Sequence, residues 1–449
     1  MTQADLAAPR LTSVEEARRI VLAQATTLGS EQVRLEDGIG RVLVQDLIAE
    51  ASLPPFDNSA MDGYALRSSD ATQATADRPV KLRLVGEVAA GHVLDRMLSR
   101  GEVAKIMTGA PLPPGADSVV MLEEARLREG MAPPPAAGLK GPALRAELPL
   151  VAAAGGGVVE LRSPVALGHH VRKAGEDIKA GETVLQTGAR IRLQHLGLLA
   201  GLGYADLPVY RAPSVAVLAT GSELVNVDEP LPPGKIRNSN SLLLAALLRR
   251  LGIEPVDLGT VIDERNLLRR QLKQAARCDV LLISGGVSVG ARDLVKTVLR
   301  ELGMETLFWR VNMKPGKPLL FGRLSVGGSR DRIVFGLPGN PISCVACFVV
   351  FIAPYLKRVT GESEPANGLV HARLTQSLRK KEAKTVLLTA QLREDAGTLV
   401  VAPTPQQGSG MLTSLAQANA FIVVPEDVME LAAGSRVEVL PFGSEPWLC

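Results

Sequence analysis

The residues best suited to chemistry lie in four loops, each of which follows a short apolar run. These loops are 220–223, Asp263, the glycine-rich segment 284–290 and the proline-containing segment 337–341. Glycines let backbone N–H groups approach an anion closely, and a following helix presents its positive N-terminus. The loops therefore favour a phosphorylated ligand, and a simple tight turn is the alternative for Gly285-Gly286.

Carboxylates accompany these loops. Glu223 and Asp263 belong to two of them, and Asp293 comes shortly after the glycine-rich segment. If the loops gather at one edge of a sheet, the three carboxylates would repel a bare phosphate. Carboxylates beside a phosphate cradle therefore predict a Mg²⁺ ion between them.

A basic turn at residues 312–318 is a second candidate for binding an anion. Lys314 and Lys317 flank a Pro-Gly pair there. Proline restricts the backbone, and the two ammonium groups are point charges that suit an oxyanion. A solvated basic turn is the competing interpretation.

Two polar loops in the first third of the chain also stand out. Residues 54–64 place Asp57 and Asp62 in a turn-rich segment, and residues 106–111 contain Thr108 before a glycine. An ordered loop of this kind often carries function. The alternatives are a series of β-turns for the first loop and a turn-capping threonine for the second.

The cysteines and histidines predict neither a disulfide framework nor a metal site. Cys344 and Cys347 have C-x-x-C spacing, but they fall inside a predicted apolar helix without a second ligand pair. Buried thiols are therefore the better interpretation. The five histidines cluster only at His169-His170, and we assign them no metal.

Composition restricts the classes of function. With 449 residues, 46% of them hydrophobic, the chain is long enough for about three globular domains. A net charge of +3 and 3% aromatic residues argue against nucleic acid and a membrane surface as partners. The apolar run 342–356 contains Ser343 and Pro354 and falls short of a membrane span. We see no secretory leader and expect a cytoplasmic protein.

The spacing of apolar residues predicts which elements position these loops. A capping box at Ser13 begins a helix over 13–28, and the texture from about 46 to 160 is β-like, with an Ala/Gly/Pro-rich insertion at 130–157. From about 211, strands and helices alternate, which predicts a doubly wound parallel sheet with helices on both faces and its ligand beyond the carboxyl strand ends. Short alternating runs after 362 predict a small β-domain. The expected strands are 214–219, 253–261, 279–283, 332–335, 385–389 and 420–424, and the expected helices are 241–251, 264–277, 292–302 and 341–357.

Several of these motifs together resemble a known family. The chain is similar over about residues 10–445 to bacterial MoeA and to the E domain of gephyrin. The motifs that carry the resemblance occur in the family's order: 56–65, 106–110, 175–178, 284–290, 314–318 and 337–341.

The resemblance implies an α/β plus β multidomain fold. It implies a discontinuous helical N-terminal domain (1–45 with 160–195), an inserted β-domain (46–159), a doubly wound α/β molybdopterin-binding domain (196–360) and a small C-terminal β-barrel (361–449).

The resemblance also implies an activity, that of a molybdopterin molybdenumtransferase. With Mg²⁺, such an enzyme takes adenylylated molybdopterin and molybdate, releases AMP and leaves molybdenum on the dithiolene. It works as a homodimer whose active site combines the α/β domain of one subunit with the β-domain of the other. A molybdopterin adenylyltransferase and acceptor molybdoenzymes are its expected partners.

Roles for individual residues follow from the same resemblance. One half-site would hold Asp62, Thr108 and Asp177, while Glu223, Asp263 and Asp293 would bind Mg²⁺ or position the substrate. The pterin phosphate would contact Ser284, Gly285, Gly286 and Ser288. Molybdate and the developing charge would meet Lys314, Lys317, Ser343 and Lys384, with the loop shaped by Pro338, Asn340 and Pro341.

The sequence departs from the family pattern at two positions. Ala291 stands where most relatives carry Glu, although Asp293 is kept. Lys384 stands where relatives often carry Arg, which keeps the charge but loses the planar fork that suits an oxyanion. The resemblance therefore leaves open whether metal and molybdate bind here as in those relatives.

Two other functions compete with the transferase. A molybdopterin adenylyltransferase would consist of the α/β domain alone and typically carries Gly-Gly-Thr-Gly, where this chain has Gly285-Gly-Val-Ser288. A gephyrin-like scaffold would not need the lysines and carboxylates at the strand ends. The flanking domains and the different glycine-rich loop argue against the adenylyltransferase, and the lysines and carboxylates argue against a scaffold, so the sequence favours the transferase.

Overall fold

The computed structural model describes residues 11–129, 139–140, 157–287, 294–325, 330–362 and 368–443. Ser288, Ala291, Asp293 and nearly all of the predicted insertion at 130–157 lie outside these ranges. The chain divides into a larger compact unit (Met1–Gln45, Thr187–Leu196 and Asp206–Cys449) and a smaller one (Asp46–Gln186 and Gly197–Ala205). This division is coarser than the four predicted domains, whose boundaries stay a prediction.

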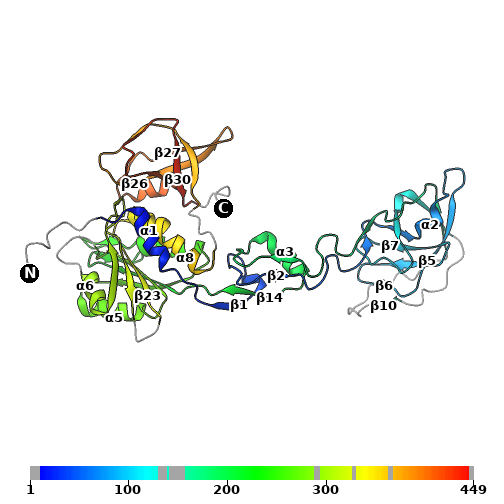
Figure 1. Cartoon of the computed structure of the whole chain (residues 1–449), viewed down its shortest axis with the longest axis horizontal. Coiled ribbons are helices and arrows are strands. Elements are labelled where there is room, and N and C mark those ends of the chain that lie inside the picture. The colour runs from blue at the N-terminus through cyan, green and yellow to red at the C-terminus, as the bar shows by residue number, and fades with distance from the viewer. Residues whose placement is uncertain are drawn as a thin grey trace, which may run out of the picture. The chain divides into compact units, whose positions relative to one another are not determined.

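The larger unit is built on a six-stranded sheet (Figure 1). The four predicted strands are parallel, as expected. The sheet continues at one edge with two strands that were not predicted, and both pairings there are antiparallel, so that only the fifth strand runs against the others. The reason is the length of the connections: segments 310–319 and 325–331 are shorter than the dozen or more residues of a parallel crossover. The strand order is β18 (Pro255–Val261), β15 (Val215–Thr220), β19 (Val280–Ser284), β23 (Arg332–Leu337), β22 (Leu320–Leu324) and β20 (Met304–Trp309).

Helices cover both faces of this sheet, because both faces of its central strands are apolar. On β15, Val215 and Val217 belong to one buried cluster and Ala216 and Leu218 to another. The first cluster includes residues of α1 (Val14–Ala23), α4 (Asn240–Arg250) and the helical run 341–359. The second includes residues of α5 (Arg265–Ala275) and α6 (Leu294–Glu301). The predicted doubly wound arrangement is thus confirmed.

Local sequence explains where α1 begins and why it is shorter than predicted. The Ser13 hydroxyl accepts a hydrogen bond from the Glu16 amide at 3.1 Å, which caps the N-terminus as expected. The helix ends at Ala23 and not at residue 28. Two β-branched threonines, Thr26 and Thr27, follow the end of the helix, and such residues lose side-chain freedom in a helix.

The predicted helix over 341–357 is a continuous helical run with a wider turn inside it. It consists of α7 (Pro341–Cys347), a π-helical segment (Phe348–Ile352) and α8 (Ala353–Val359). Pro354 lacks the N–H of an α-turn, and the wider turn stands directly before it. By length and composition this run is apolar enough to cross a membrane, but 83% of its most apolar stretch is buried inside the protein. We interpret it as a core helix.

The C-terminal part of the larger unit contains a closed five-stranded barrel, as predicted. The strands follow one another as β26 (Thr385–Asp395), β27 (Thr398–Pro403), β24 (Val370–Leu374), β30 (Arg436–Pro441) and β28 (Ala420–Val424). Pairing of β28 with β26 closes the ring. A short strand, β21 (Met313–Lys314), runs beside β26, so the basic turn 312–318 is anchored to the barrel.

The smaller unit contains a curled six-stranded sheet with an apolar cluster on each face. The strand order is β8 (Ser118–Met121), β4 (Gly63–Leu66), β7 (Glu102–Ile106), β5 (Val80–Val88), β11 (Gly157–Leu161) and β9 (Ala125–Glu129). A short pair, β3 (Asn58–Ser59) with β12 (Val171–Arg172), joins the 54–64 loop to the segment after β11.

Candidate active site

Strand register places the polar loops of the α/β sheet side by side. Ser284 pairs with Ala219 on one side and with Leu337 on the other, and Thr220 pairs with Val261. The loops that follow β15, β18, β19 and β23 therefore leave the same edge of the sheet. This is the edge at which open α/β sheets bind ligands.

Backbone geometry requires the two glycines after β19. Gly285 has φ +95° and Gly286 has φ +64°. A Cβ on Gly285 would lie 2.3 Å from the carbonyl oxygen of Thr220, and one on Gly286 would lie 2.4 Å from Val295 Cγ2. The Gly285 amide donates to the Leu337 carbonyl at 3.0 Å, so this N–H is already used within the sheet edge. The glycines thus serve close packing as well as any approach to an anion.

Asn240 connects two of these loops and was missed by sequence reasoning. Its Nδ2 donates to Ser284 Oγ and to the Gly339 carbonyl oxygen, both at 2.8 Å. Asn240 and Ser284 are buried, and the Asn240 Oδ1 atom is buried without a partner among the described residues. The only signal in the sequence was its place at the start of the helix predicted from 241, where asparagine usually indicates a cap.

The two described carboxylates of the predicted metal set are exposed. Asp263 accepts hydrogen bonds from the Thr220 hydroxyl at 3.0 Å and from the Ser222 amide at 3.3 Å. The Glu223 carboxylate lies over Gly221, because a Cβ built there would be 2.6 Å from Oε2. Both loops therefore present carboxylate oxygen atoms at the ligand edge.

Lys314 and Lys384 lie together on the barrel side of the larger unit. Both form ion pairs with Glu382, at 3.4 Å for Lys314 Nζ and in a closer contact for Lys384. Hydrogen bonds from Lys384 and Lys314 lower the pKa of Glu382. Lys317 is held by its backbone, since its carbonyl accepts from the Val311 amide at 2.9 Å. Lys314 and Lys384 thus form a cationic pair whose charge is partly neutralised by Glu382.

The helix after β23 packs against the loops that contain Ser284, Pro338 and Gly316. Cys344 Sγ lies 3.5 Å from Ser284 Oγ and donates to the Pro338 carbonyl at 2.9 Å, while Cys347 Sγ lies 3.8 Å from the Gly316 carbonyl oxygen. Burial raises the pKa of Cys344 to about 12 and that of Cys347 well above its usual value. Both thiols are buried, as predicted, and are protonated at neutral pH.

The loop 337–341 connects this helix to the C-terminal part of the larger unit. Pro341 is the first residue of α7, and the side-chain Nδ2 of Asn340 donates to Ser409 Oγ at 2.9 Å. Ser343, for which contact with molybdate stays a prediction, is only 3% exposed.

In the smaller unit, Asp62 and Thr108 are in direct contact. The Thr108 amide and hydroxyl both donate to Asp62 Oδ1 at 2.7 Å, and these two bonds lower the pKa of Asp62. Asp177 is exposed, and its amide donates to the Leu53 carbonyl. The structure thus brings together the first pair, and it places Asp177 on the loop that follows β12.

Three loops of the smaller unit converge around this pair. The Ser59 amide donates to the Ala110 carbonyl, which joins loop 54–64 to loop 106–111. Asp57 accepts hydrogen bonds from Lys173 Nζ and from the Ala174 amide, both at 2.8 Å. Sequence reasoning singled out Asp57 but not Lys173, because no local pattern links residues this far apart.

Family models match most of the chain. The model of the MoeA N-terminal region (domains I and II) covers residues 12–203. A probable molybdopterin binding domain covers 216–358, and the MoeA C-terminal region (domain IV) covers 371–442.

Relatives that match over nearly their full length belong to the same family. The chain is 34% identical to the molybdopterin molybdenumtransferase of Bacillus subtilis, over 97% of this chain and 96% of the relative. It is 37% identical to molybdopterin molybdenumtransferase 2 of Mycobacterium tuberculosis, over 95% and 98%. A crystal structure of a molybdopterin biosynthesis MoeA protein from Pyrococcus horikoshii matches with TM-score 0.78 and 31% identity, covering 97% of this chain and all of that chain.

Proposed function

Because the chain belongs to the MoeA family of molybdopterin molybdenumtransferases, enzymes of molybdenum cofactor biosynthesis, we propose that it inserts molybdate into adenylylated molybdopterin with release of AMP. The single observation that carries this proposal is the ligand edge of the α/β sheet. There Glu223, Asp263, Ser284 and the two glycines leave neighbouring strand ends.

Mg²⁺ fits the residues at this edge. Exposed carboxylate oxygens are hard ligands, and Mg²⁺ typically uses one or two of them together with water and substrate phosphates. Glu223 and Asp263, with Asp293 outside the described residues, would hold the ion. When bound, Mg²⁺ supplies positive charge that neutralises the phosphoanhydride.

The protein's own groups would act mainly by electrostatics. We assign Lys314, Lys317 and Lys384 to molybdate and to the charge that develops as the anhydride is cleaved. Fixed cations of this kind stabilise a transition state without reorganising during the reaction. Neither Cys344 nor Cys347 serves as a nucleophile in this proposal, because both thiols are buried and protonated.

The test is AMP release from adenylylated molybdopterin by the purified full chain in the presence of Mg²⁺, with and without molybdate. The proposal expects AMP release that requires molybdate. An adenylyltransferase would instead consume ATP and form the adenylylated compound from molybdopterin. A scaffold would bind without any turnover, so each alternative gives a different product pattern.

We further propose that the chain acts as a homodimer and that residues of both subunits serve each substrate. Asp62→Asn and Asp263→Asn change exposed carboxylates in different units of the chain. Two inactive variants of this kind, mixed under conditions that exchange subunits, would regain activity, because each mixed dimer would contain one intact site. Sites confined to single chains would leave the mixture inactive.

Cellular context also belongs to this proposal. We place the enzyme in the cytoplasm, where it would receive its substrate from a molybdopterin adenylyltransferase and pass its product to acceptor molybdoenzymes. Fractionation of cells, followed by detection of the chain in the soluble fraction, tests the location. Co-purification with either partner class tests the hand-over.

A further inference from the structure

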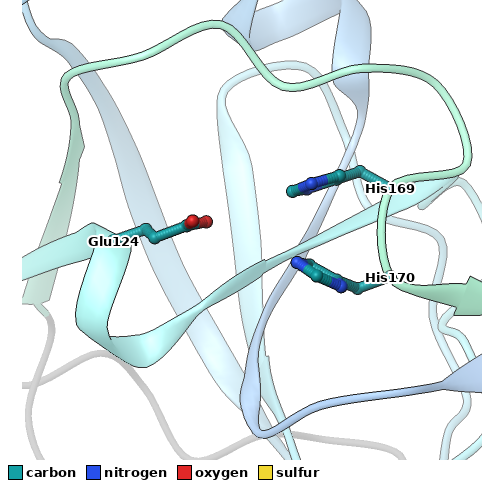
Figure 2. A group of neighbouring side chains, drawn as sticks. All are labelled: Glu124, His169 and His170. Atoms are coloured by element: carbon teal, nitrogen blue, oxygen red, sulfur yellow. The ribbon is translucent and has the colours of Figure 1, made fainter.

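Glu124, His169 and His170 form a cluster in the smaller unit, apart from the residues assigned above. One ligand atom from each side chain lies within 4.8 Å of the other two. Figure 2 shows the Glu124 carboxylate pointing toward the two imidazole rings. Glu124 ends the 3₁₀ turn η3 (Leu122–Glu124) after β8, and the histidines lie between β11 and β12.

An unusual backbone conformation brings the two histidines together. His170 has φ +54°, in the left-handed region that few residues other than glycine adopt. The centroids of the two consecutive rings are 4.0 Å apart. Backbone strain of this kind is found preferentially at functional sites.

The surrounding backbone fixes this conformation. The Val119 amide donates to the His169 carbonyl at 2.8 Å, and the Ala60 amide donates to the His170 carbonyl at 2.9 Å. The Gly168 amide donates to Ser118 Oγ at 3.1 Å. The imidazole pair is therefore held on a rigid frame, as a binding site requires.

The side chains of the cluster retain unused polar atoms. His169 Nδ1 is buried and has no hydrogen-bond partner within the described ranges. A buried polar atom without a partner costs about 1–3 kcal/mol. Glu124 is exposed, and it takes part in no ion pair within the described ranges. The cluster thus offers one buried ring nitrogen without a partner and a carboxylate that forms no ion pair among the described residues.

We propose that Glu124, His169 and His170 bind a divalent transition-metal ion of the Zn²⁺ class. Two histidines and one glutamate, with a fourth position for water, are an established ligand set for this ion. With metal–ligand distances of about 2.0–2.1 Å, tetrahedral ligand atoms lie roughly 3.3 Å apart. Because the ligand atoms all lie within 4.8 Å of one another, the side chains need to approach by at most about 1.5 Å to reach that value.

The proposed ion would hold the loop that carries Asp62. The Leu122 amide, at the start of η3, donates to the Asp62 carbonyl at 3.3 Å, and Ala60 donates to His170. The metal would therefore connect two segments that each hydrogen-bond to residues 60–62. It is distinct from the Mg²⁺ proposed at the α/β sheet.

The test uses the full chain, stripped of metal by a chelator and titrated with CoCl₂ while visible absorption is recorded, followed by displacement with ZnCl₂. His170→Asn is the informative variant, because asparagine tolerates the left-handed backbone but removes the imidazole. Glu124→Gln removes the carboxylate charge. His371→Gln, which changes an exposed side chain of strand β24 in the larger unit, is the matched control.

We expect stoichiometric binding to the wild-type chain. Loss of a ligand should weaken binding by more than the roughly 10- to 100-fold that loss of an outer-shell partner costs. The control His371→Gln should bind as wild type. Absence of stoichiometric binding to the wild type, or unchanged affinity in a correctly folded His170→Asn variant, would overturn the proposal.

Discussion

Asn240 provides a quantitative test of how the sheet edge is built. Replacement by leucine keeps a similar side-chain volume but removes the donor that holds Ser284 Oγ and the Gly339 carbonyl. Gly339 is exposed, so water can replace Asn240 at its carbonyl, and each of the two lost hydrogen bonds costs about 0.5–1.5 kcal/mol. Since both partners stand in loops of the proposed site, part of this cost should appear in catalysis.

The expected result for Asn240→Leu is a folded protein with kcat/KM for AMP release lowered about 10- to 100-fold, at about 1.4 kcal/mol for each factor of ten. The matched control is Asn238→Leu. Asn238 is equally buried, and its Nδ2 also donates to two oxygens, of Ser241 and Thr260, but not to the glycine or proline loops of the site.

The control should lose thermal stability with kcat/KM unchanged. If Asn240→Leu lowers only the melting temperature and keeps kcat/KM, as the control should, then Asn240 does not position the site and the reasoning is wrong.

Three further predictions follow from single contacts. Gly285→Ala should lower both melting temperature and activity, because its Cβ would meet the Thr220 carbonyl. Gly259→Ala, also at positive φ but with no atom within 4 Å, should show only the backbone cost of about 1–2 kcal/mol; equal effects in the two variants would contradict this. Burial alone would raise the pKa of Asp279, but hydrogen bonds from Arg211 and Ser214 lower it in the folded protein. The Asp279 carboxylate therefore stabilises the fold above its pKa in the unfolded chain, about 3.9, and this stabilisation is lost as pH falls through its pKa in the folded protein. The difference in unfolding free energy between wild type and Asp279→Asn, from urea titrations, should therefore shrink below about pH 4; a difference independent of pH would refute this. Lys384→Arg should lower the KM for molybdate, because a planar guanidinium can bind an oxyanion through two parallel bonds; an unchanged KM would show that this position does not contact molybdate.

Sequence patterns predicted the elements of the α/β sheet well, because each has a strong apolar period and a clear boundary. The helix predicted over 241–251 is found at Asn240–Arg250, and the strand predicted over 279–283 at Val280–Ser284. The antiparallel edge was not predicted, since strand direction depends on connection length and pairing partner. The alternation of apolar and polar residues within β20 or β22 determines neither property.

The candidate site shows the same division between local and long-range information. Gly285 and Gly286 were recognisable as a pair directly after a predicted strand, although a tight turn was the alternative for that loop taken alone. Asn240, Lys173 and the cluster of Glu124 with His169 and His170 were not recognised. Their partners lie far away in the sequence, and only the fold brings them together.

The most direct test of the account is the stoichiometry of a single turnover. Excess full-length protein is mixed with adenylylated molybdopterin, Mg²⁺ and molybdate, and the AMP released is compared with the molybdenum that remains bound to the pterin product. If the proposed reaction takes place, the two amounts are equal, and neither product forms when molybdate is omitted. AMP release without molybdenum incorporation, or at the same rate without molybdate, would contradict it.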